Sequence, residues 1–111
     1  MKKLWVDDER QAPDDSWIVA RTVNEACRLI ASQHMTEISL DHDDGVDSFE
    51  AVAYVIGEKY FVEKGFPEFC SKMKIVCPRL YPKITIHSAN PIGAKRMIDI
   101  LKDYGIACEG Y

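Results

Sequence analysis

Short apolar segments alternate along this chain with segments that have helical periodicity, and this alternation constrains the fold most. Extended segments are predicted at residues 3–6, 17–21, 37–40 and 84–86, and a short last one at 106–108. Strands that alternate with helices usually pair in parallel through right-handed crossovers. The sequence therefore predicts an α/β fold built on a parallel sheet.

Three helices are predicted between these strands. The first follows Thr22, which forms a capping box with Glu25, and the second opens near residues 47–48. The third begins at Pro91 after Asn90, which is a favoured capping residue. Each helix carries an apolar stripe at helical spacing, so each is expected to pack one face on the sheet.

Two connections depart from this alternation. Residues 11–16 contain Pro13 and are too short to hold a full helix, so a loop is expected there. Residues 64–83 contain three prolines, and the sequence leaves open either a short helix or an extended excursion.

The length and composition favour one domain over residues 1–111. A hydrophobic content of 47% is enough for a core without disulfides. No apolar stretch approaches the ~20 residues that span a bilayer, and Asp7 and Asp8 interrupt the apolar start, so a cytoplasmic protein is expected. The net charge of −4 argues against a broad duplex-DNA footprint but permits a local pocket for a terminal phosphate.

Cysteine and tryptophan residues have structural explanations. Cys27 and Cys108 lie within apolar patterns and are predicted to be reduced core thiols. Trp5 and Trp17 are predicted to lie in the core or on a sheet face and not to serve as base-stacking platforms. The four cysteines lack the close pairs of a zinc clip, and the state of the second and third stays open: Cys27, Cys70, Cys77 and Cys108.

The residues best suited to chemistry follow three predicted strands. Asp7-Asp8 follow the first, Asp41-His42-Asp43 the third, and His87-Ser88 the fourth. Ligands of parallel sheets bind outside the carboxyl ends of the strands, where neighbours lie ~4.8 Å apart. Carboxylates at such distances repel one another, and a hard divalent cation relieves that repulsion and can hold a phosphate. The sequence predicts such a site at Asp7, Asp8 and Asp41.

Other interpretations apply to part of this set. Asp44 and Asp47 flank a turn and a helix start, and we expect them to be solvated caps. Side chains on a strand alternate between faces, so neighbours such as His87 and Ser88 converge only where the strand has become a loop. His87 has the alternative of a buried histidine bonded to its neighbours.

The segments "LWVDDE", "ISLDHD" and "ITIHSAN" resemble response-regulator receiver domains. This resemblance implies a flavodoxin-like three-layer sandwich with strand order 2-1-3-4, a fifth strand at the edge, and the first helix replaced by a loop. It also implies that Asp7 and Asp8 bind magnesium, with the carbonyl of Asp43 as a further ligand. Asp41 would be the phosphate acceptor and Ser88 the assisting hydroxyl.

The departures from receivers point to a related family. Receivers carry a lysine after the fifth strand, and residues 108–111 contain none. His42 and His87 are not receiver features. The combination "LWVDDER", "SLDHD" and "HSANP" instead resembles the receiver-derived family named for cyclic-phosphate processing, except over residues 64–83. That resemblance implies action on cyclic phosphates of nucleotides or RNA ends, with Mg²⁺ or Mn²⁺.

Opening a cyclic phosphodiester with water requires a base, an acid and positive charge at the phosphoryl oxygens. Imidazole titrates near neutral pH, so His42 and His87 are predicted to serve as acid and base or to ligate a metal. Backbone amides from Ser88 through Asn90 into the capped helix suit an anion. Arg10 is a candidate phosphate clamp, with an exposed turn arginine as the equal alternative.

The sequence therefore predicts a metal-assisted phosphoesterase of the receiver fold. Two alternatives stay open. The first is a divergent signalling receiver, phosphorylated on Asp41 or acting by partner binding. The second is a module that binds a cyclic nucleotide or phosphate without turnover. No membrane partner is expected, and the oligomeric state is left open.

Overall fold

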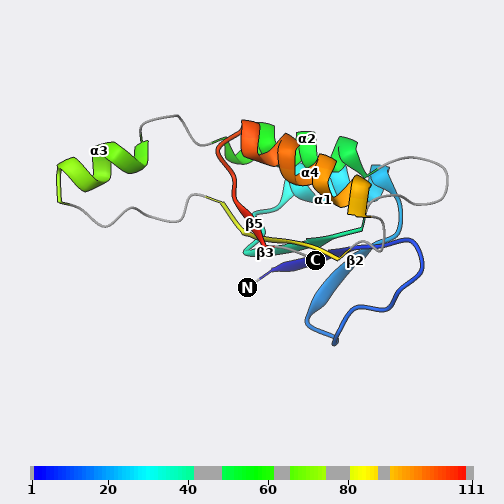
Figure 1. The fold of residues 1–111 in the computed structure, drawn as a ribbon. Coiled ribbons are helices and arrows are strands. Elements are labelled where there is room, and N and C mark those ends of the chain that lie inside the picture. The colour runs from blue at the N-terminus through cyan, green and yellow to red at the C-terminus, as the bar shows by residue number, and fades with distance from the viewer. Residues whose placement is uncertain (1, 42–48, 62–65, 75–80, 88–90, 110–111) are drawn as a thin grey trace.

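The computed structural model describes residues 2–41, 49–61, 66–74, 81–87 and 91–109 (Figure 1). The strands and helices follow in this order along the chain: β1 Lys3–Val6, β2 Trp17–Ala20, α1 Val23–Ser32, β3 Glu37–Leu40, α2 Glu50–Tyr60, α3 Phe66–Lys72, β4 Lys83–Ile86, α4 Pro91–Asp103 and β5 Cys108–Glu109. The segment at 64–83 thus contains a short helix, α3, which Figure 1 shows set apart from the sheet.

The strands form one five-stranded parallel sheet in the order β2-β1-β3-β4-β5. Val6 pairs with Ala20 on one side and with Leu40 on the other, and Leu40 pairs with Ile86. The strand ends therefore lie level with one another at one edge of the sheet. The α/β class, the parallel pairing, the predicted strand order and the short fifth strand are confirmed.

Alternate residues of the central strands build the hydrophobic core. Leu4 of β1, Leu40 of β3 and Ile86 of β4 are buried against the helices. Figure 1 shows α1, α2 and α4 side by side over this one face of the sheet. Trp5 of β1 and Thr85 of β4 point to the opposite face and are half-buried, whereas Ser39 on the same face of β3 is buried.

The layers differ from the three-layer sandwich that the resemblance implied. Among the residues that the structure describes, no helix covers the opposite face of the sheet, so the domain has one sheet and one helix layer. The physical reason is the connection from β1 to β2, which contains no helix over residues 7–16. This loop confirms the predicted loss of the first helix. We call the helix-free side the open face of the sheet.

Local signals explain where the helices begin and end. Thr22 caps α1 by accepting a hydrogen bond from the amide of Glu25 at 3.2 Å. In a capping box the Glu25 carboxylate would accept a hydrogen bond from the amide of Thr22. Here it accepts one from the amide of Arg21, one residue earlier. Gly105 ends α4 with φ 77°, a left-handed conformation that favours glycine. The predicted capping residue Asn90 and the helix start at residues 47–48 lie outside the described residues.

Close packing joins the helices to one another. A Cβ on Gly57 of α2 would lie 2.2 Å from Cδ2 of Tyr104, so only glycine fits at this contact with the segment after α4. The ammonium of Lys59 donates to the carbonyls of Ile30 and Gln33 and so caps the end of α1. Cys27 and Cys108 are free thiols. None of the described helices is long and apolar enough to cross a membrane.

Candidate metal and phosphate site

The sheet continues for one residue beyond three of its strands, and these extra residues carry the predicted site. The amides of Asp7, Asp41 and His87 still donate to carbonyls of neighbouring strands. The donor–acceptor distances are 3.1 Å from Asp7 to Ala20, 2.9 Å from Asp41 to Val6 and 2.8 Å from His87 to Leu40. Because each lies two residues after an open-face position, their side chains point to that same face. The alternation of strand side chains therefore unites these three residues.

Asp7, Asp8 and Asp41 form an acidic cluster. One carboxylate oxygen of each residue lies within 4.8 Å of the other two. In an octahedral Mg²⁺ site with bonds of ~2.1 Å, oxygens on opposite sides of the ion are ~4.2 Å apart. The observed limit is close to that spacing, and the donors are all hard oxygens. Oxygens at neighbouring octahedral positions are closer still, at ~3.0 Å, so the three carboxylates would have to draw together around a shared Mg²⁺ or Mn²⁺.

Asp7 is the most constrained member of the cluster. Its side chain is 1% exposed, and its Oδ1 accepts hydrogen bonds from the amides of Glu9 and Arg10, both at 2.9 Å. Its Oδ2 lies 2.9 Å from Nε2 of His87. Burial alone would raise the pKa of Asp7, but the bonds from the two amides and from His87 outweigh burial and lower it. Asp7 is thus held as a carboxylate.

His87 is engaged on both edges and one face of its ring. Nε2 contacts Asp7, Nδ1 lies 2.7 Å from Oγ of Ser39, and the ring stacks on Trp5 with centroids 4.0 Å apart and planes 5° apart. Burial lowers the pKa of His87, although Asp7 and Asp41 act to raise it. Because a carboxylate only accepts, Nε2 is the nitrogen that donates to Asp7.

Two arginines fix the loop that follows β1. Nη1 of Arg10 donates to the carbonyl of His87 at 3.1 Å. Nη1 of Arg21 donates to the carbonyls of Asp7 at 3.0 Å and of Arg10 at 2.6 Å. The indole of Trp5 donates to the same Arg10 carbonyl at 3.1 Å. These bonds tie β1, β2 and β4 together beside the acidic cluster.

The family model described as the cyclic-phosphate processing receiver domain matches residues 2–103. The chain belongs to this family. The match includes residues 64–83, over which the sequence motifs gave no resemblance. Neither a curated protein nor a solved structure matches the chain.

For this cyclic-phosphate processing receiver domain, the structure brings together part of the predicted site. Asp7, Asp8, Asp41 and His87 lie at one edge of the sheet, with Arg10 beside them. The remaining predicted residues lie outside the described part of the chain: His42, Asp43, Ser88 and Asn90. The prediction that Arg10 clamps phosphate stays a prediction.

Sequence reasoning missed Ser39 and Arg21. The sequence pattern predicts Ser39 only as part of an apolar strand, and Arg21 only as the end of another. One signal was present for the serine, because a polar residue on the open face of a central strand must find a hydrogen-bond partner there. For Arg21 the sequence carries no comparable signal, since an arginine at the end of a strand is ordinarily a solvated residue.

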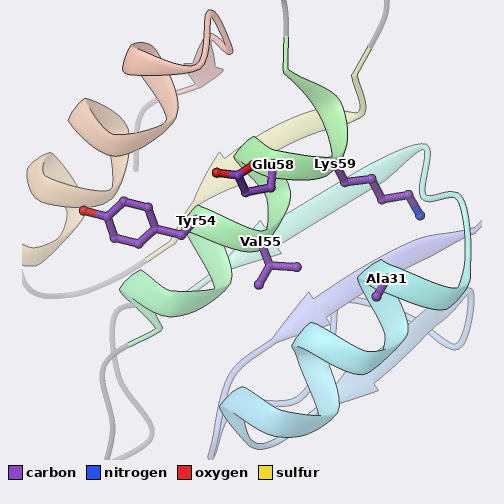
Figure 2. Close-up of a pocket in the computed structure, with 5 residues that line it drawn as sticks. All are labelled: Ala31, Tyr54, Val55, Glu58 and Lys59. Carbon is purple, nitrogen blue, oxygen red and sulfur yellow. The ribbon is translucent and has the colours of Figure 1, made fainter.

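Several hollows lie outside the acidic cluster, and two of them differ in their position relative to it. One is a shallow groove of about 460 Å³ on the helix layer, and Figure 2 shows its lining from α1 and α2: Ala31, Tyr54, Val55, Glu58 and Lys59. None of the predicted site residues lines it. The other, of about 530 Å³, lies between residues 11–15 and β2 and is lined in part by Arg21. Arg21 also donates to the backbone carbonyl of Asp7, so one side chain connects this second hollow with the end of β1.

Proposed function

We propose that this domain is a metal-assisted phosphoesterase that opens the cyclic phosphate of a nucleotide or an RNA terminus. The observation that carries the proposal is the convergence of Asp7, Asp8 and Asp41 at the strand ends, with oxygens within 4.8 Å of one another. Membership of a family described by cyclic-phosphate processing supports the same substrate class.

The three carboxylates would hold one divalent ion, which would neutralise charge on the phosphoryl oxygens of a bound ester. Asp7 is fixed by two backbone amides and by His87, so it offers a rigid ligand. Asp8 and Asp41 are half-buried, so both are partly accessible to solvent. Rigid positioning of this kind matters because phosphoryl transfer depends mainly on orientation and electrostatics.

The reaction itself needs two proton transfers. Water attacks phosphorus and gives up a proton, and the bond to one ring oxygen breaks as that oxygen takes up a proton. We propose His42, which follows Asp41 in the sequence, for one of these transfers. For His87 the acid–base role stays a prediction. Nε2 is bonded to Asp7 and Nδ1 to Ser39, so one of these hydrogen bonds must break before the ring can exchange a proton with a substrate.

The hollow beside Arg21 supports a ligand larger than a phosphate. Its volume of about 530 Å³ lies within the range of ~300–1,000 Å³ that small-molecule sites occupy. Arg21, which lines the hollow, also donates to the backbone carbonyl of Asp7 and so links the hollow to the strand end that carries the acidic cluster. We propose it as the place of the sugar and base.

A substrate panel tests this function directly. The purified chain is incubated with 2′,3′-cyclic nucleotides and with RNA ending in a cyclic phosphate, with Mg²⁺, with Mn²⁺ or with chelator, and products are separated by chromatography. We expect metal-dependent formation of a phosphomonoester, reduced about a hundredfold or more in Asp41→Asn. Asp99→Asn is the matched control, because Asp99 is an exposed carboxylate on α4 that pairs with Lys95.

The same panel separates the alternatives. Binding of cyclic nucleotides without any product would contradict turnover and favour a binding module. Stable labelling of Asp41 by acetyl phosphate, with no hydrolysis of cyclic substrates, would favour a signalling receiver. Equal turnover in wild type and Asp41→Asn would remove the acidic cluster from the reaction.

A further inference from the structure

Ser39 lies on the open face of the sheet, beneath the contacts that His87 makes with Trp5 and Asp7. It sits in β3, in register with Trp5 of β1 and Thr85 of β4. It is 4% exposed, although serine is usually a surface residue. A buried hydroxyl in this position requires a partner, and its Oγ has one in Nδ1 of His87 at 2.7 Å.

His87 reaches across a whole strand to make its contacts. It follows β4, whereas Trp5 and Asp7 belong to β1 and its end, and β3 separates the two strands. Strands two positions apart in a sheet lie ~10 Å from one another. The imidazole and the indole nevertheless stack at 4.0 Å, so both rings must lean over β3. The residue of β3 below them has to be small, and that residue is Ser39.

The hydrogen-bond chemistry of the ring follows from its two partners. In neutral imidazole one nitrogen donates and the other accepts. Asp7 Oδ2 only accepts, which assigns the proton to Nε2, and the hydroxyl of Ser39 is then the donor to Nδ1. Without that hydroxyl, only the contact with Asp7 would favour a proton on Nε2, since the stack on Trp5 is equally compatible with either tautomer.

We infer that Ser39 is a positioning residue that holds the His87 ring so that Nε2–H points at Asp7 and fixes that carboxylate in the acidic cluster. By donating to Nδ1, the hydroxyl reinforces the tautomer that Asp7 requires, and the small side chain leaves room for the stack on Trp5. The inference rests on the proposed function only where it treats Asp7 as a metal ligand. Partners of metal ligands commonly change metal affinity by 10–100-fold.

Nitrogen NMR of the metal-free protein tests the orientation of the ring. The ring nitrogens of His87, assigned by their loss in His87→Gln, are expected to show Nε2 protonated and Nδ1 unprotonated in wild type. Ser39→Ala keeps the space but removes the donor to Nδ1, and we expect the second tautomer to gain population because Asp7 alone then favours Nε2–H. Ser39→Thr restores a hydroxyl and should restore the wild-type pattern. Thr85→Val is the control, because it removes a hydroxyl from the same face of the next strand.

Calorimetric titration with Mg²⁺ tests the consequence for the cluster. We expect Ser39→Ala to bind at least about tenfold more weakly than wild type, and Ser39→Thr and Thr85→Val to bind within about threefold of it. Wild-type nitrogen signals in Ser39→Ala would overturn the inference. So would unchanged Mg²⁺ affinity in a variant whose tautomer has changed.

Failure of the proposed function has a different signature. If wild type binds Mg²⁺ but processes no cyclic phosphate, the function fails and the positioning role stands. If wild type binds no Mg²⁺, the part of the inference that concerns a metal ligand is overturned. The NMR pattern still decides whether Ser39 orients His87 toward Asp7.

Discussion

Replacing Asp8 by Asn should make the metal-free protein more stable. The change removes one of three charges whose oxygens lie within 4.8 Å of one another. Two unit charges at that distance repel by ~0.9 kcal/mol in a water-like dielectric, and Asp8 takes part in two such pairs. Salt reduces the sum to about 1 kcal/mol. With an unfolding entropy of ~2.1 cal/mol/K per residue, that gain raises the Tm of this chain by about 4 °C.

Mg²⁺ should remove or reverse this difference in Tm between wild type and Asp8→Asn. At a free concentration ten times the Kd, a ligand that binds only the native state adds ~1.4 kcal/mol, or about 6 °C for wild type. Asp8→Asn loses one ligand, and we expect its Tm to rise by less than about 2 °C at the same concentration. The variant thus melts higher without Mg²⁺, and wild type draws level with it or passes it when Mg²⁺ is bound.

Differential scanning calorimetry with chelator and with Mg²⁺ measures both effects. Asp99→Asn is again the control and should respond to Mg²⁺ as wild type does, since Asp99 lies on α4. An equal Mg²⁺ response in wild type and Asp8→Asn would refute the metal site. A lower Tm of metal-free Asp8→Asn would refute the argument from repulsion.

Three further predictions concern stability and reactivity. Gly57→Ala places a Cβ 2.2 Å from Tyr104, so overpacking of ~1–3 kcal/mol should outweigh the ~1 kcal/mol that alanine gains in a helix. Urea unfolding should show a net loss, which reverses to a gain in a Tyr104→Ala background. Burial raises the pKa of Cys108 from 9.0 to about 11, so mass spectrometry should find alkylation about a hundredfold slower than that of a free thiol near neutral pH. Burial lowers the pKa of His87 below its ordinary value of 6.5, so just below pH 6.5 the unfolded chain binds more protons than the folded one. The free energy of unfolding should therefore fall as the pH drops below 6.5. Urea titrations should show a smaller fall in His87→Gln.

The sequence was most informative where apolar runs meet acidic residues. The first and third strands were predicted to the residue, at 3–6 and 37–40, because Asp7 and Asp41 end the apolar pattern abruptly. The gathering of the acidic cluster also followed from the sequence, since parallel strands bring their carboxyl ends to one edge. Both predictions rest on local composition and a general rule of topology.

The rest depended on tertiary structure. Helical periodicity shows that a helix exists but not which face of the sheet it covers, so the open face was not foreseen. The partner of His87 was equally hidden, because Ser39 reads as a routine strand residue until β3 is placed between β1 and β4. The sequence left His87 either an acid–base or metal-ligand role or that of a buried histidine bonded to its neighbours, and the second interpretation describes the contacts of the ring.

The row of Asp7, Asp41 and His87 also has a consequence for folding. The contact between Asp7 and His87 joins residues 80 positions apart in the sequence, and β3 has to be inserted between their strands before it can form. Contacts between residues so far apart in the sequence form late, because the entropy cost of closing a long loop precedes the stabilisation that the contact gives. A folding intermediate without β4 would therefore hold the carboxylates of Asp7 and Asp41 without the imidazole that restrains them. During refolding, the complete site should appear together with the last native hydrogen-exchange protection in β4, so its assembly reports on the whole fold.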